Sequence, residues 1–149
     1  MSSFASVVNA FGEHLGIAGL ALDAQGCCRL VFDGQRMLEL RASSAQRRLI
    51  LSVGLGGAGD FASNGIERLL LRANLWGAGA SGGWFAIDEK ERICLQQEVA
   101  LGDESAALMI AKIEGMLNGV ELWEKKFSAP SSAFMSPEAV AMARMAQKV

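Results

Sequence analysis

The sequence has 149 residues, of which 51% are hydrophobic and 20% are charged, and its formal net charge is -2 at pH 7. This length and balance predict one globular domain with a single core, and they exclude a chain that is disordered over most of its length. The small negative charge argues against a nucleic-acid-binding protein, whose phosphate contacts need a clustered basic face.

The N-terminus and the cysteines bear on the cellular compartment. Residues 1–4 lack the basic start of an export signal, and no apolar run reaches the ~18 residues that a membrane span requires. The three cysteines, Cys27, Cys28 and Cys94, form neither a CxxC pair nor an even disulfide framework. We therefore expect a cytoplasmic protein whose cysteines are small buried side chains.

Apolar residues recur at helical spacing near the start of the chain and predict a short amphipathic helix. They are Phe4, Val7, Val8, Phe11 and Leu15. Ser2 or Ser3 can cap the first turn, and Gly16 and Gly19 end the helix. The lone histidine, His14, lies at the end of this helix, and one imidazole cannot form a multi-histidine metal site.

The period of the apolar pattern then changes from 3.6 to 2, which predicts strands. We expect strands at about 28–32, 38–42 and 48–53. Asp33-Gly34 predicts a tight hairpin turn between the first two, because glycine adopts a positive φ without steric cost. The three strands are therefore expected to form an antiparallel meander.

A glycine-rich segment, Gly54–Gly59, follows the third strand and matches the pattern G-x-G-x-x-G. In a dinucleotide-binding fold such glycines bring the backbone close to a pyrophosphate at a helix N-terminus. Here residues 60–65 separate the motif from the next helix, and the preceding strand is hairpin-linked, whereas that fold needs a βαβ crossover. A loop is the preferred interpretation, and a small dinucleotide-binding protein using Gly54–Gly59 is kept as an alternative function.

The next predicted helix runs from Asn64 to Leu75, with Asn64 as its cap and Glu67 as the reciprocal partner. It is apolar on nearly every side and contains three consecutive leucines, residues 69–71. These leucines cannot all face one sheet, so we expect a second face of the helix to meet another subunit. The candidate dimer-interface residues are Leu70, Leu71, Leu75, Trp76 and Trp84.

The second half of the chain predicts a hairpin and a long helix. Residues 84–87 and 93–99 are expected to be strands joined by the charged turn 88–91, and Asp103 is expected to cap a helix that extends through Phe127. We expect residues 1–127 to form the domain. Residues 128–149 are expected to be a flexible tail with a short helix of marginal stability.

No pattern in the sequence predicts a catalytic residue, a metal site or a cofactor. The acidic pairs Asp88/Glu89 and Asp103/Glu104 fall at a turn and at a helix start, which are common structural positions for carboxylates. Nothing marks any of the three cysteines as an activated nucleophile. We predict that the protein is not an enzyme.

The order helix, three strands, helix, two strands, long helix resembles that of the class I type III secretion chaperones (Tir-chaperone, CesT-type family). The similarity covers about residues 4–127. Residues 15–30 resemble the family's opening pattern, residues 69–75 its central helix ending in Ala-Asn-Leu, and residues 87–101 its late hairpin. Trp123 stands where the family often has a tryptophan.

The resemblance implies an α+β fold: a helix, a three-stranded antiparallel meander, a helix, a β-hairpin and a long C-terminal helix, in a homodimer. It implies a cytoplasmic type III secretion chaperone that binds the N-terminal segment of an effector and keeps it soluble and export-competent, with the export-apparatus ATPase as a further partner. A regulator of the same fold that sequesters a partner protein is another alternative. Effector-binding candidates, beside a sheet edge and the first helix, are Phe4, Val7, Phe11, Leu30, Phe32, Leu38 and Leu40.

Overall fold

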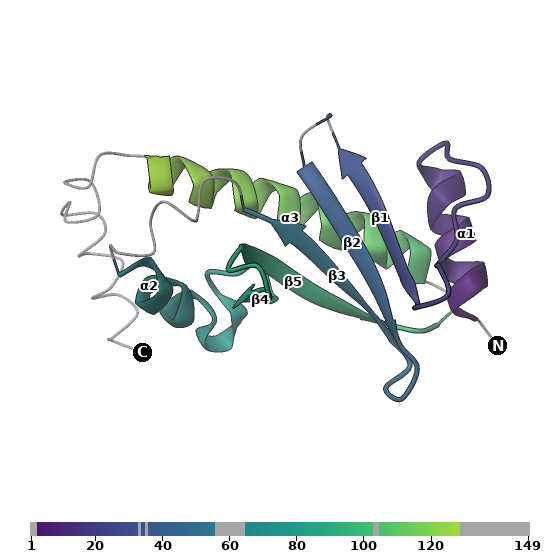
Figure 1. Cartoon of the computed structure of the whole chain (residues 1–149), viewed down its shortest axis with the longest axis horizontal. Coiled ribbons are helices and arrows are strands. Elements are labelled where there is room, and N and C mark those ends of the chain that lie inside the picture. The colour runs from purple at the N-terminus through teal and green to yellow at the C-terminus, as the bar shows by residue number, and fades with distance from the viewer. Residues whose placement is uncertain (1–2, 33, 35, 56–64, 103–104, 129–149) are drawn as a thin grey trace.

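The structure, a computed structural model, describes residues 3–32, 34, 36–55, 65–102 and 105–128 (Figure 1). In chain order the elements are α1 (Phe4–His14), β1 (Cys27–Phe32), β2 (Arg36–Ser43), β3 (Arg48–Gly54), α2 (Ile66–Ala73), the 3-10 turn η2 (Leu75–Gly77), β4 (Trp84–Ile87), β5 (Ile93–Ala100) and α3 (Ser105–Ser128). This order confirms the expected α+β fold. Among the helices of the described ranges, none combines the length and the apolarity that a membrane crossing needs.

The five strands in the described part of the chain form one antiparallel sheet, in the order β1-β2-β3-β5-β4. The meander and the late hairpin are joined because β3 pairs with β5, with Leu51 opposite Gln97 and Val53 opposite Leu95. Figure 1 shows α3 lying across one face of the sheet, α1 at the β1 end of the molecule and α2 at the other end. The strands β1 and β4 are therefore the two edges of the sheet.

The core lies between the sheet and the helices α1 and α3, and α2 adds Ile66 and Leu70 to it. Alternate residues of the strands point to this side, as the period of 2 predicts, and α1 and α3 contribute one apolar stripe each. The largest fully buried side chains are Phe11, Leu38, Leu40, Leu49, Leu51, Ile66, Leu95, Met109, Met116, Val8 and Val53. Trp123 closes one end of this core: its indole N–H donates to the carbonyl of Gly79 at 2.9 Å, and its ring packs edge-on against Phe85.

The start of α1 confirms the predicted cap, whereas the predicted limits of α2 are wrong. Ser3 and Ser6 form a reciprocal capping box at the first turn of α1. The N-cap of α2 is Gly65, with a φ of 73° and no side-chain cap, and the α-helix ends at Ala73. It ends early because Trp76, with a φ of 58°, adopts a left-handed conformation that cannot continue a right-handed helix.

Several expectations fall outside the described residues. These are the cap role of Asp103, most of the glycine run at residues 56–59, and the tail after Ser128. The division into a domain at 1–127 and a tail at 128–149 stays a prediction.

Candidate binding surfaces

An exposed apolar surface extends over α2, η2 and β4, and we call it the α2 surface. Its members are Leu71, Leu75, Trp76 and Ile87, with exposed fractions of 70%, 54%, 90% and 50%. Isolated exposed apolar residues are ordinary, but a contiguous group of large ones on a single chain typically marks an interaction site. Burying four such side chains would contribute several kcal/mol, since a fully buried leucine or similar residue is worth roughly 1.5–3 kcal/mol.

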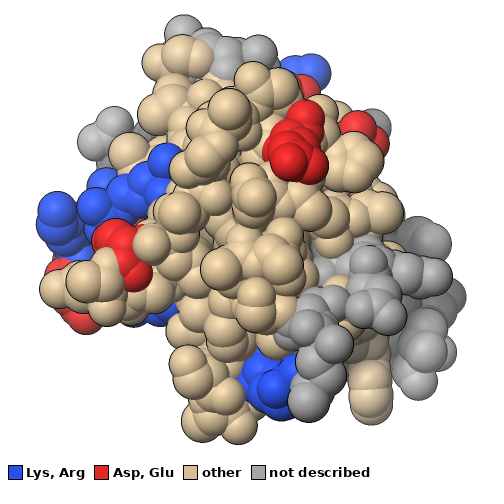
Figure 2. Space-filling model, turned by 90° about the vertical axis from the view of Figure 1, so that its right-hand side faces the viewer, with Lys and Arg blue, Asp and Glu red and all other residues tan. Residues whose placement is uncertain are grey.

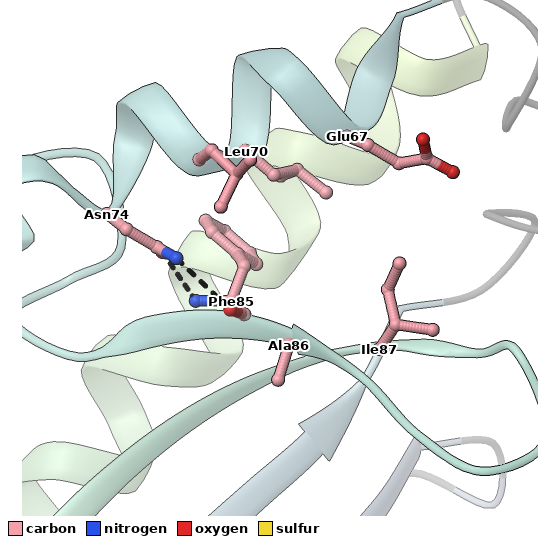
Figure 3. A pocket seen from close by; sticks show the side chains of 7 residues that line it. Glu67, Leu70, Asn74, Phe85, Ala86 and Ile87 are labelled. Carbon is pink, nitrogen blue, oxygen red and sulfur yellow. Dashed lines mark hydrogen bonds between the residues drawn. The ribbon is translucent and has the colours of Figure 1, made fainter.

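A pocket adjoins the α2 surface, between α2 and β4 (Figure 3). It is lined by Glu67, Leu70, Leu71, Asn74, Phe85, Ala86 and Ile87. Glu67 is its one charged member and lies at the opposite end from Asn74 in Figure 3. The pocket is therefore suited to an apolar side chain of a partner protein.

The structure separates the five dimer-interface candidates into three groups. Leu71, Leu75 and Trp76 belong to the α2 surface, whereas Leu70 is buried under it. Trp84 is half-buried, and its indole N–H donates to Gln96 Oε1 at 2.9 Å on the neighbouring strand. Ile87 is a member of the surface that the sequence interpretation missed, because alternation alone does not tell which edge residue stays uncovered.

The edge strand β1 offers unpaired backbone groups. The amide of Ala42 donates to the carbonyl of Gly26, which fixes the hydrogen-bonding register of β1 and β2. In this register the backbone N–H and C=O groups of Cys28, Leu30 and Phe32 bond to β2, and those of the residues between them point away from β2. The outward backbone groups of Cys27 already have partners: its amide donates to Asp23 Oδ1 at 3.0 Å, and its carbonyl accepts from the Asp23 amide at 2.7 Å. The outward N–H and C=O groups of Arg29 and Val31 have no hydrogen-bond partner among the residues that the structure describes.

The effector-binding candidates occupy two environments. Val7, Phe11, Leu38 and Leu40 lie in the core of the single chain and have almost no surface to offer a partner in this conformation. Phe4, Leu30 and Phe32 are half-buried and pack against the outside of that core. Leu30 and Phe32 share one face of the open edge strand, which makes them the best placed of the seven for contact with an added segment.

The surface at the β1 end is mostly uncharged. Figure 2 views this end, and its middle is covered largely by residues other than Lys, Arg, Asp and Glu. On the sheet face opposite α3, the carboxylate of Glu39 pairs with Arg29 at 3.1 Å and Arg41 at 2.9 Å. The hydrogen bond to Glu39 is the main cause that raises the pKa of Arg41. The ion-paired side chains of Arg29, Glu39 and Arg41 thus make this face of the sheet charged beside the β1 edge.

The geometry offers little support for nucleophilic or dinucleotide chemistry. Burial raises the pKa of the Cys28 and Cys94 thiols, which keeps them protonated and poorly nucleophilic. The strand before the glycine run, β3, is antiparallel to both of its neighbours, whereas a dinucleotide-binding βαβ unit needs parallel strands. The described part of Gly54–Gly59 therefore favours the loop interpretation.

The sequence interpretation missed Asn74 as a structural residue. Its side-chain amide donates to the carbonyl of Phe85 at 3.1 Å, and its side-chain oxygen accepts from the amide of Phe85 at 2.6 Å (Figure 3). The sequence gives a polar residue at the end of a helix but does not indicate a partner 11 residues away on a strand. This contact could be found only from the tertiary structure.

Solved structures share this fold. A chain of the ExsC-ExsE complex matches with a TM-score of 0.73 and 23% identity, over 85% of this chain and 97% of that chain. A chain of the HopA1-SchA chaperone-effector complex matches with a TM-score of 0.66 and 21% identity, over 80% and 91%. A chain of the structure of the Yersinia pestis type III secretion chaperone SycH in complex with a stable fragment of YscM2 matches with a TM-score of 0.64 and 15% identity, over 80% and 98%.

The family comparison is more specific than these fold similarities. A search of curated proteins gives no significant match. The family model described as the Tir chaperone protein (CesT) family matches residues 6–124 and confirms the resemblance seen in the sequence. It is a family of chaperones rather than a class of enzymes. With the match extending over most of its length, the chain belongs to the Tir chaperone protein (CesT) family.

Proposed function

We propose that this protein is a cytoplasmic type III secretion chaperone that binds the N-terminal segment of an effector and keeps it soluble and competent for export. Family membership supports the chaperone role. Three proteins of similar fold were solved with bound partners, one of them in a structure described as a chaperone-effector complex. The ATPase of the export apparatus is a further partner that we propose on the family resemblance alone.

The observation that carries the proposal is the open edge of β1. Two outward residues, Arg29 and Val31, present backbone donors and acceptors at the spacing that an added strand would use. The half-buried side chains of Leu30 and Phe32 flank them on the core side and can pack against alternate residues of that strand. An extended client segment thus gains affinity from the backbone and selectivity from the apolar side chains.

We further propose that the chain acts as a homodimer through the α2 surface. The same surface on two copies would form a symmetric interface, in which exposed residues such as Trp76 cover apolar residues of the other copy. Aromatic and leucine side chains are suited to the centre of such an interface. The β1 edge lies at the other end of the molecule from α2 (Figure 1), so each protomer would keep its client site free.

The test is co-expression with candidate effector N-terminal segments encoded nearby, followed by co-purification and sizing by light scattering. The expected product is a stable complex of two chaperone chains and one effector segment. Amide exchange should then slow at Arg29 and Val31 when the segment is bound. A client that co-purifies without protecting these amides would contradict strand addition at β1.

A matched pair of variants separates backbone pairing from side-chain packing. Val31→Pro removes one outward N–H, and it leaves the β1–β2 ladder intact because Val31 does not bond to β2. Val31→Thr keeps the N–H and the branched shape. We expect client affinity to fall at least tenfold for Val31→Pro and little for Val31→Thr. Equal affinity of the two variants would show that this N–H is not used.

A further inference from the structure

The second edge of the sheet, β4, is closed by a side chain. The amide of Asp88 donates to the carbonyl of Arg92, which fixes the hydrogen-bonding register of β4 and β5. In this register the backbone N–H and C=O groups of Ala86 bond to β5, whereas those of Phe85 and Ile87 point away from β5. Both outward backbone groups of Phe85 are bonded to Asn74, the amide at 2.6 Å and the carbonyl at 3.1 Å. The side-chain amide of Asn74 thus makes the same two hydrogen bonds that a residue of an added strand would make.

The loop after α2 holds Asn74 against β4. The amide of Asn74 still donates to the carbonyl of Leu70 at 3.0 Å, which fixes its backbone at the end of α2. The chain then reverses through left-handed residues, and the amide of Gly79 donates to the carbonyl of Ala73 at 3.0 Å. A Cβ at Gly79 would lie 2.7 Å from the Cβ of Ala73, so this close return requires glycine. The side chain of Asn74 is therefore positioned by backbone contacts on both sides of it.

The two edges of the sheet consequently differ in what they offer to another strand. The β1 edge has two successive outward residues, Arg29 and Val31, without partners among the described residues. The four-residue strand β4 has two outward residues, and one of them, Phe85, is occupied by Asn74. Strand addition needs a run of consecutive pairings, and unpaired edges are also sites of unwanted association between copies.

We propose that Asn74 is a strand-edge cap, a specificity-determining residue that closes β4 to pairing and leaves β1 as the edge where an extended segment adds. The choice of β1 for a client rests on the proposed function. The closing experiment uses no client, so its failure would be distinguishable from a failure of the chaperone proposal.

The main variant is Asn74→Leu, which keeps a similar volume and removes both hydrogen bonds. We expect the amide of Phe85 to exchange with solvent at least tenfold faster than in the wild type, while the amide of Ala86, which bonds to β5, stays protected and reports on the fold. We also expect species larger than the wild-type assembly in light scattering, because the opened β4 edges of different copies can pair.

A second-site variant and a milder substitution keep the test decisive. Adding Ile87→Pro removes the other outward N–H of β4, and we expect it to suppress the larger species. Adding Ile87→Ala instead removes the same side chain of the α2 surface but keeps the N–H, and the larger species should persist. If Asn74→Leu does not fold, Asn74→Asp replaces it: this side chain still accepts from the Phe85 amide but cannot donate to its carbonyl, so the same association is expected to a smaller degree. Unchanged Phe85 exchange, an unchanged assembly, or larger species that persist with Ile87→Pro would each overturn the proposal.

Discussion

Replacing Leu71 with aspartate tests whether the α2 surface forms a dimer. Full burial of a leucine side chain is worth roughly 1.5–3 kcal/mol. Leu71 is 70% exposed in the single chain, so its burial in an interface contributes about 1–2 kcal/mol for each copy and about 2–4 kcal/mol for two symmetric copies. Each 1.4 kcal/mol is a factor of ten, so Leu71→Asp should raise the dimer dissociation constant by about 30- to 700-fold. Two facing carboxylates would weaken the interface further.

The assay is sedimentation velocity or light scattering over a dilution series, with the free energy of unfolding measured beside it. Because Leu71 lies outside the core, we expect the variant to remain folded. Leu108→Asp is the matched control: Leu108 is an exposed leucine near the start of α3, the end of that helix that lies toward α1 and not toward α2 (Figure 1), and this variant should keep the wild-type dissociation constant. A Leu71→Asp protein that dimerises as tightly as the Leu108→Asp protein would refute the α2 interface.

Three further predictions concern stability. Gly83→Ala should destabilise the fold by more than about 2 kcal/mol in urea denaturation, because a Cβ at Gly83 would lie 1.9 Å from the carbonyl oxygen of Gln96 in β5. Gly115→Ala, at an open position within α3, should instead stabilise the fold by about 0.5–1 kcal/mol. Equal effects of the two substitutions would contradict the close packing at Gly83. Trp123→Phe should cost about 1–3 kcal/mol by leaving the carbonyl of Gly79 without its indole donor, and an unchanged urea midpoint would count against that role. Backbone hydrogen bonds lower the pKa of Asp23 below its ordinary 3.8, so its stabilising contribution is present above that pH and is lost as the pH falls through the lower pKa of the folded state. Asp23→Asn should flatten the acid limb of the stability profile, and an identical limb would rule this contribution out.

Local patterns were sufficient to predict most elements of this fold. Alternation in β1 and β2, and the helical spacing in α1, gave the element types because each periodicity follows from the backbone geometry. The limits of α2 were the main error. An Asn and a Glu three residues apart predicted a capping box, but Gly65 is the N-cap, and the left-handed conformation of Trp76 was not evident from its side chain.

The candidate surfaces were predictable only in part, because periodicity identifies the apolar face of an element and not what covers it. Among the effector-binding candidates, Leu38 and Leu40 are on a central strand and fully buried, while Leu30 and Phe32, with the same alternation, are on an edge strand and half-buried. Their difference comes from the strand order. That order depends on the long-range pairing of β3 with β5 and is not encoded in either strand alone.

By itself the sequence determined the α+β class, the succession of helices and strands and the chaperone family, since these depend on residue spacing and on collinear motifs. Only the tertiary structure decided which sheet edge is open and which is closed. The closure of β4 depends on two hydrogen bonds between Asn74 and Phe85, which are 11 residues apart and are brought together because the chain after α2 returns to the sheet. In this contact the side chain of Asn74 bonds to a backbone amide and carbonyl. Because nearly every residue carries these two groups, no local sequence pattern predicts which residue Asn74 will bond to.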